Sequence, residues 1–250
     1  MPTRIRKFHT RLSPWRRSLA GLCVVLLSAP VPAGLLLTPH TAEYKVKIRV
    51  LGGRLTTQLE ATPDGYVASH VIKPTGMSRM FARGMISESS DFYSAPDGIR
   101  PREYWSRDTL SRDKENVRVS FDWETGEARG TVNGEDVLSV MDALAHDRIS
   151  IQYQLMHDLL RGELSVEYTM FEIDRLRTVN VRKIGEKTIT VPAGQFEVVG
   201  LQHQAEGSKR VTTLWCAAQL GYLPVVIEQH RKGKLRVRAT LSEYAPIADP

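Results

Sequence analysis

Residues 211–241 read VTTLWCAAQLGYLPVVIEQHRKGKLRVRATL, and this stretch decides the fold. It contains three strand-like segments separated by two turns. In the last segment Leu235, Val237, Ala239 and Leu241 alternate with polar residues, which is typical of a strand with one buried and one solvent-facing side. Because such a meander cannot bury its apolar face alone, it requires a larger sheet or barrel.

The same period of two recurs along most of the chain. Tyr44, Val46, Ile48 and Val50 alternate with charged residues, and Gly52-Gly53 then turns the chain. Two shorter strands are expected beside the turns at 125–126 and 133–134. The other expected strands are 55–59, 66–73, 86–93, 101–110, 117–123, 166–173, 176–184, 187–191 and 195–201.

Helical spacing appears twice. Over Asp147 to Leu160, apolar residues recur every three to four positions, and Asp147 and Gly162 can cap the two ends. A short helical insertion carries Met77, Met80 and Phe81 on one face. We therefore expect one main helix and one short helical turn in an otherwise β chain.

These patterns predict a mainly β fold in a single domain over residues 34–250. We expect a single antiparallel, strongly curved sheet or half-open β-barrel of about eleven strands. Closure would remove the exposed edges that so many strands otherwise present. The main helix would cover one side of the sheet.

The charge of the chain is unevenly distributed. There are 34 basic and 28 acidic residues, and six of the basic residues lie within residues 1–33, which contain no acid. The rest of the chain is therefore balanced. Because phosphate binding requires a basic surface, the bulk charge gives no support for a nucleic-acid-binding protein.

The first 33 residues have the parts of an export signal. A basic segment ends at Arg17, an apolar run covers 19–27, and small residues precede a cleavage site after Ala33. We expect a cleaved signal peptide over 1–33, a periplasmic protein and no stable membrane span after cleavage. The alternative is a retained anchor over 19–37, which Pro30 and Pro32 would interrupt.

The common catalytic and cofactor motifs are absent from the sequence. After signal cleavage Cys216 is the one remaining cysteine, and a lone cysteine in a strand is typical of a buried apolar residue. The histidines are scattered, and we interpret them as solvated or capping residues. We expect no catalytic residue, no metal ligand and no cofactor.

Aromatic and methionine residues carry the strongest indication of a ligand. Flexible thioethers suit surfaces that adapt to varied apolar partners. A curved sheet with the methionine-bearing helical insertion over its mouth would enclose an apolar pocket. The alternative is that these residues are ordinary core. The candidate ligand-binding residues are Met77, Met80, Phe81, Phe121, Trp123 and Trp215.

A basic cluster follows the second strand of the meander. Arg231, Lys232, Lys234, Arg236 and Arg238 could meet an anionic lipid or a peptidoglycan carboxylate. The alternative interpretation is a solvated turn and outer strand face.

Several blocks in order resemble one bacterial family, the domain of unknown function 3108. They are TAEY at 41–44, TGM at 75–77, FDW at 121–123, DRIS at 147–150, GEKTITVPAGQF at 185–196, TLW at 213–215 and GYLPVVIE at 221–228. The resemblance covers roughly residues 38–245. It implies an exported, mostly β protein of Gram-negative bacteria with no assigned enzymatic activity. The implied sheet is similar to that of the lipoprotein localisation factors, which hold acyl chains in a half-open barrel, and this second likeness concerns the fold alone.

Three functions follow as hypotheses. The first is a non-enzymatic binding or carrier protein for a lipid or a lipoprotein acyl chain. The second is a structural or interaction module with an envelope protein as its partner. The third is an enzyme acting on envelope glycans, with Asp122, Asp147 or Glu228 as candidate acids.

Overall fold

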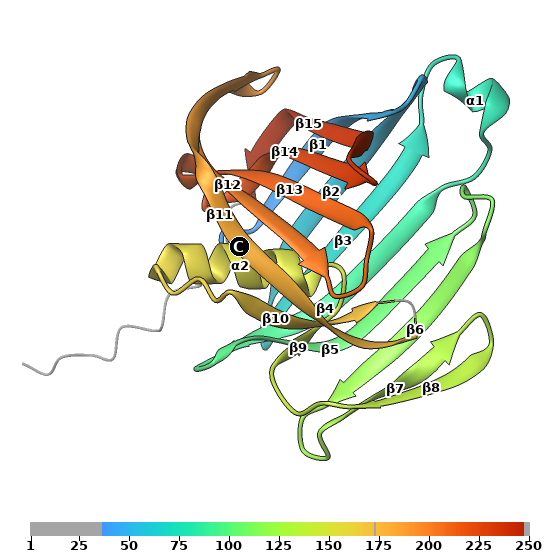
Figure 1. Cartoon of the computed structure of the whole chain (residues 1–250), viewed down its shortest axis with the longest axis vertical. Helices are drawn as coiled ribbons and strands as arrows, with labels where there is room; N and C mark the ends of the chain where they lie inside the picture. The colour runs from blue at the N-terminus through green and yellow to red at the C-terminus, as the bar shows by residue number, and fades with distance from the viewer. Residues whose placement is uncertain (1–36, 173, 248–250) are drawn as a thin grey trace, which may run out of the picture. The chain divides into compact units, whose positions relative to one another are not determined.

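The computed structural model describes residues 37–172 and 174–247. The predicted signal peptide over 1–33 lies outside the described residues. The first and last strands, β1 (His40–Ile48) and β15 (Lys234–Pro246), pair antiparallel, with Tyr44 opposite Leu241 and Val46 opposite Ala239. All four side chains are buried. This pairing joins two meanders into one sheet (Figure 1).

The strands of the sheet lie in the order β8-β7-β6-β5-β4-β3-β2-β1-β15-β14-β13-β12-β11-β10-β9. The strands that follow β1 are β2 (Leu51–Thr62), β3 (Gly65–Pro74), β4 (Ile86–Ala95), β5 (Gly98–Asp108), β6 (Glu115–Asp122), β7 (Glu127–Val132), β8 (Glu135–Val140) and β9 (Ala145–His146). Those before β15 are β10 (Glu167–Glu172), β11 (Arg175–Val191), β12 (Gly194–Ala205), β13 (Arg210–Ala217) and β14 (Leu223–Arg231).

The mainly β fold is confirmed, but the expected number of about eleven strands is wrong. Fifteen strands occur within the described residues. The segments expected at 176–184 and 187–191 form one strand, β11, and the two-residue strand β9 was not expected because it is too short to show any period. The sheet is antiparallel except where β9 runs parallel to β10.

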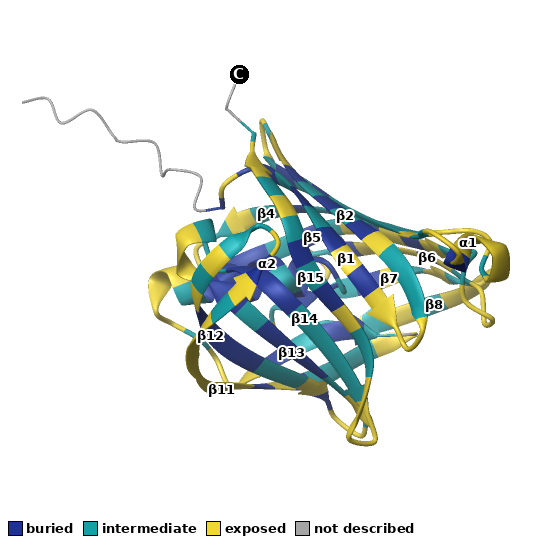
Figure 2. Cartoon of the chain, turned by 90° about the horizontal axis from the view of Figure 1, so that it is seen from above, coloured by how far each residue is buried: buried dark blue, intermediate teal, exposed yellow. Residues whose placement is uncertain are grey.

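The sheet is strongly curved, as predicted, without closing into a barrel. Its two edge strands are β8 and β9. Curvature brings β9 against β5 and β11 against β8, although neither pair forms a hydrogen-bonded ladder. Figure 2 shows the buried residues gathered on the inside of this curve, around the main helix.

The main helix α2 (Ser150–Arg161) is confirmed close to its predicted range, and the short helix α1 (Ser78–Phe81) forms where the insertion was expected. Gly162 ends α2 in the left-handed conformation at φ 72°, which favours glycine. α2 lies inside the curve of the sheet (Figures 1 and 2).

Asp147 holds the start of α2. Its Oδ1 accepts hydrogen bonds from the backbone N–H groups of Ile149 (2.7 Å) and Ser150 (2.9 Å). Its Oδ2 accepts from the hydroxyls of Ser90 on β4 (2.6 Å) and Ser150 (2.8 Å). Because the carboxylate is fully buried, these bonds offset its desolvation and tie the helix to the sheet.

Two apolar faces of α2 pack against two parts of the core. Ile149, Tyr153 and Met156 belong to the larger cluster, which includes Phe92 and other side chains of β1 to β6. Ile151 and Leu155 belong to a second cluster formed with β10 to β13. A helix with apolar residues on both faces is typical of a buried helix.

Through His146 the stability of the fold depends on pH. Its side chain is fully buried, and within the described residues neither ring nitrogen has a hydrogen-bond partner. Burial lowers the pKa of His146 to about 3, against a smaller opposing effect of Asp97. The unfolded chain takes up the proton near its ordinary pKa of ~6.5, so this contribution to stability is present above that pH and is lost as the pH falls towards 3.

We expect His146→Leu to weaken the pH dependence of stability. Protonation of His146 in the unfolded chain alone should lower the free energy of unfolding by about 2 kcal/mol between about pH 7.5 and about pH 5. Urea unfolding at both pH values measures this. An unchanged pH dependence in the variant would contradict the assignment.

Candidate functional site

The turns that join β1 to β2, β12 to β13 and β14 to β15 lie at one end of the sheet, which we call the mouth. Ile48, at the end of β1, is opposite both Leu51 of β2 and Val237 of β15. Arg231, at the end of β14, is opposite Arg210 at the start of β13. The sheet therefore brings segments far apart in the sequence to one rim.

A cavity of about 240 Å³ lies between the mouth and α2. The helix forms its floor through Ile151, Gln152 and Leu155. The walls are mixed in character. Their apolar residues come from both meanders and are Val46, Leu55, Ile72, Met170, Ala205, Leu214, Ile227, Val237 and Ala239. Their polar residues are His70, Arg148, Glu172, His203, Gln204, Ser208, Arg210, Thr212 and Gln229. On the other side of α2 the larger core cluster fills the sheet. The cavity therefore lies on the side of α2 that carries Ile151 and Leu155, whereas Tyr153 and Met156 pack in the larger cluster.

Arg148, a charged residue of the cavity wall, is held by ion pairs and a hydrogen bond. Arg148 lines the cavity, and its guanidinium pairs with Glu88 (3.1 Å) and with Glu115. Its Nε donates to the Tyr104 hydroxyl at 2.8 Å. Although burial lowers the pKa of Arg148, the nearby Glu88, Tyr104 and Glu115 raise it overall. This cluster ties the start of α2 to β4, β5 and β6.

Two histidines also line the cavity. Burial lowers the pKa of His70 to about 4, against an opposing effect of Glu88, and burial lowers the pKa of His203 to about 4. Both are therefore neutral at neutral pH. The prediction that the histidines are solvated or capping is wrong for His40, His146 and His157, which are buried inside the curved sheet.

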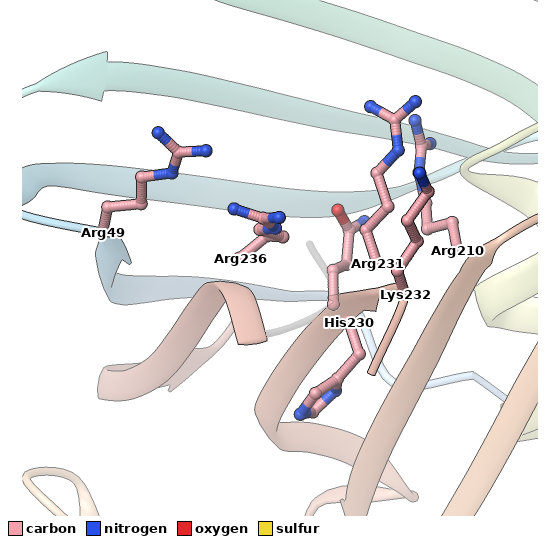
Figure 3. Close-up of a pocket in the computed structure, with 7 residues that line it drawn as sticks. Arg49, Arg210, His230, Arg231, Lys232 and Arg236 are labelled. Carbon is pink, nitrogen blue, oxygen red and sulfur yellow. The ribbon is translucent and has the colours of Figure 1, made fainter. Parts of the chain in front are cut away.

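A second pocket, of about 400 Å³, lies at the rim of the mouth. Arg210 and Gln229 line both this pocket and the apolar cavity, so the two spaces adjoin. Figure 3 shows the side chains of Arg210, Arg231 and Lys232 extending to the same side, while the ring of His230 points the other way. The pocket is lined by Arg49, Arg210, Gln229, His230, Arg231, Lys232 and Arg236.

The six predicted ligand-binding residues do not gather in one place, and none of them lines the 240 Å³ cavity. Met77, Met80 and Phe81 on α1 are each about three-quarters exposed. The Ser78 hydroxyl accepts a 2.7 Å hydrogen bond from the backbone N–H of Gly52, which places α1 at the mouth end of β2.

The three predicted aromatic residues lie elsewhere. Phe121 is buried in the larger core cluster, and the Trp123 indole donates to the Pro101 carbonyl at 2.7 Å. The Trp215 ring packs over Gly200, where a Cβ would come within 2.6 Å of it, and Lys187 Nζ lies 3.4 Å from its centre. Neighbouring strand residues face opposite sides, so Trp215 points away from the cavity that Leu214 lines. The cavity residues that sequence reasoning missed are aliphatic and polar side chains, and strand alternation or helical spacing marked the aliphatic ones without showing that they line a cavity.

The acids weighed for an enzyme have structural contacts. Asp147 caps α2, Asp122 accepts from the backbone N–H groups of Glu124 and Thr125 in a turn, and Glu228 pairs with Arg238 at 3.3 Å. The described part of the chain contains no cluster of metal-ligating side chains. Cys216 is buried, and burial raises the pKa of its thiol.

These observations define a class of protein, in which a strongly curved sheet carries a helix across its concave face and a cavity above that helix. The chain belongs to the family described as protein of unknown function DUF3108, whose model matches residues 40–240. The membership predicted from its sequence blocks is confirmed. No functionally curated protein matches the chain. No helix within the described ranges is long and apolar enough to cross a membrane.

One solved structure shares this fold, and two others align more weakly. A β-barrel-like protein of domain of unknown function DUF1849 from Brucella abortus matches with a TM-score of 0.57 at 10% identity, covering 85% of this chain and 99% of that one. A proposed lipoprotein from Parabacteroides distasonis aligns with a TM-score of 0.33 at 10% identity, covering 84% of this chain and 98% of that one. A proposed exported protein with a YmcC-like fold from Bacteroides fragilis aligns with a TM-score of 0.32 at 12% identity, covering 84% of this chain and 96% of that one. The first likeness shows the fold alone.

Proposed function

We propose that this chain is a non-enzymatic periplasmic binding or carrier protein for an amphipathic ligand, a lipid or a lipoprotein acyl chain. The observation that carries the proposal is the apolar cavity between α2 and the mouth. Each CH₂ group that such a cavity removes from water contributes ~0.8 kcal/mol to binding. Export is supported by the basic and then apolar leader of the sequence.

The size of the cavity limits the ligand. Its volume of about 240 Å³ is slightly below the ~300–1,000 Å³ that encloses a drug-sized molecule. A single acyl chain could insert its end between Leu155 of α2 and the wall residues Leu55 and Leu214, leaving its polar part at the mouth. A ligand bound in this way would be apolar at one end and polar at the other.

Exposed apolar residues at the mouth fit the same function. Met77, Met80 and Phe81 project from α1 into solvent, and Arg79 and Arg83 flank them. Such a tip could contact the surface of a membrane or a lipoprotein while the acyl chain moves into the cavity. The three residues predicted on the insertion would then act in transfer of the ligand.

A second candidate function rests on the edge strand β8. Its outer edge is unpaired within the described residues, and Leu138 and Val140 are 62% and 65% exposed. An exposed apolar edge can pair with a strand of another protein. This observation favours an interaction module of the cell envelope.

Filling the cavity should abolish ligand binding. Thr212 lies on β13 in the cavity wall, and Thr212→Phe places a ring inside at no loss of strand propensity. We expect native mass spectrometry of protein purified from the periplasm to show bound ligand in the wild type and none in this variant. Thr56→Phe, beside the wall residue Leu55 but on the opposite face of β2, should keep its ligand. Ligand-free wild-type protein would contradict the proposal.

Placing a charge on α1 should slow transfer without affecting the fold. Met80 is 73% exposed, so Met80→Asp should change the free energy of unfolding by less than about 0.5 kcal/mol. We expect slower uptake of a fluorescent fatty acid from vesicles, measured by stopped flow, and the same affinity at equilibrium. Unchanged uptake would show that α1 has no part in transfer.

The edge strand gives the test of the interaction module. Leu138→Lys adds a charge at the edge of the sheet, a common means of blocking strand pairing. If β8 recruits a partner, crosslinking in envelope extracts should give a protein adduct with the wild type and none with this variant. Ligand occupancy should be the same in both. Loss of the ligand instead would argue against a separate role for the edge.

A further inference from the structure

The rim pocket at the mouth concentrates positive charge. Five of its seven lining residues are cationic and none is acidic. They come from the β1–β2 turn, the start of β13, the end of β14, the β14–β15 turn and the start of β15. The five cations are Arg49, Arg210, Arg231, Lys232 and Arg236.

These cations lack the partners that other arginines have. Arg54, Arg102 and Arg148 each pair with a carboxylate. Within residues 37–172 and 174–247, none of the five rim cations forms an ion pair. The acid Glu228 of the same hairpin is occupied by Arg238. The positive charge at the rim is therefore not neutralised by this part of the chain.

The strand register forces like charges together. Arg210 and Arg231 are direct cross-strand partners, and Arg231 is also opposite Lys234. The backbone N–H of Lys232 donates to the carbonyl of Lys209 at 3.2 Å, which adds a further cation beside them. Like charges directly opposite each other destabilise a sheet. An anion bound between them would remove this repulsion.

Arg236 reaches the pocket through an irregularity in the sheet. The register between β14 and β15 shifts where Gln229 is opposite Val237 and His230 is opposite Leu235, which leaves Arg236 as the extra residue. Such a bulge redirects a side chain. Arg236 is half-buried, and its Nε is buried without a hydrogen-bond partner within the described residues. A buried, unpaired guanidinium nitrogen indicates a site for an acceptor.

The rim pocket adjoins the apolar cavity. Arg210 and Gln229 belong to both linings. Along β13 the wall changes from Arg210 at the rim to Thr212 and then Leu214 near the helix. A ligand with its apolar end in the cavity would thus hold its polar end among the guanidinium groups (Figure 3).

We propose that the five rim cations bind the anionic headgroup, a carboxylate or a phosphate, of a single-chain lipid whose acyl chain enters the cavity above α2. This inference rests on the proposed function and adds the charge of the ligand to it. Guanidinium groups suit such headgroups because they donate paired hydrogen bonds to two oxygens. The site selects anionic over neutral lipids of the same chain length.

Isothermal titration with oleate, monoolein and inorganic phosphate tests the proposal. Oleate and monoolein share one acyl chain and differ in charge. We expect the wild type to bind oleate at least about tenfold more tightly than monoolein, and phosphate much more weakly than either. Arg210→Gln with Arg231→Gln should lower the oleate affinity by about tenfold or more and leave the monoolein affinity within about twofold.

The double variant Arg112→Gln with Arg118→Gln is the matched control. It removes the same charge from exposed positions that line neither pocket, and it should bind oleate as the wild type does. The ligand-free Arg210→Gln, Arg231→Gln protein should melt at the wild-type temperature or above, because a like-charge pair is gone. That result excludes misfolding as the cause of weak binding.

The outcomes separate the two proposals. Equal affinity for oleate and monoolein, or undiminished oleate binding by Arg210→Gln with Arg231→Gln, would overturn the anionic headgroup site and leave the carrier function standing. Phosphate binding as tight as that of oleate would likewise overturn it, since the rim would then bind anions independently of the cavity. Failure of the wild type to bind either lipid would overturn the carrier function as well.

Discussion

The buried carboxylate of Asp147 is the interaction on which the interior of the sheet depends. It accepts hydrogen bonds from the start of α2 and from Ser90 on β4, so one side chain both caps the helix and fixes it to the sheet. Burial raises its pKa, and the hydrogen bonds oppose that rise. Together with the Arg148 cluster and the packing of both helix faces, this attachment fixes the depth of the helix that floors the cavity.

The position of α2 divides the interior into two parts with different properties. Below the helix Tyr153 packs against Phe92, with ring centres 5.1 Å apart. On the other side Ile151, Gln152 and Leu155 line the cavity, and Ile151 and Leu155 also pack in the second cluster. Since core packing is normally dense, a hollow of this kind beside a packed core supports the proposed ligand site. The unpaired cations at its rim support the proposed site for an anionic headgroup.

Much of the secondary structure could be predicted from local pattern. The strand segments, α2 with its Asp147 and Gly162 ends, and the helical turn at α1 all appear where their periods placed them. The candidate site could not be predicted in this way. Trp215 was predicted to bind the ligand because it is large and aromatic, but its neighbour Leu214 lines the cavity instead. Alternation separates the two faces of a strand without indicating which face is concave.

By itself the sequence determined the strands, the turns, the main helix and membership of the DUF3108 family, because these depend on residues close together in the chain or on motifs in a set order. The tertiary structure alone decided that β1 pairs with β15, that α2 lies inside the curve, and that Arg49, Arg210 and Arg231 share one rim. The physical reason is that curvature and helix placement follow from long-range packing, which no local period records.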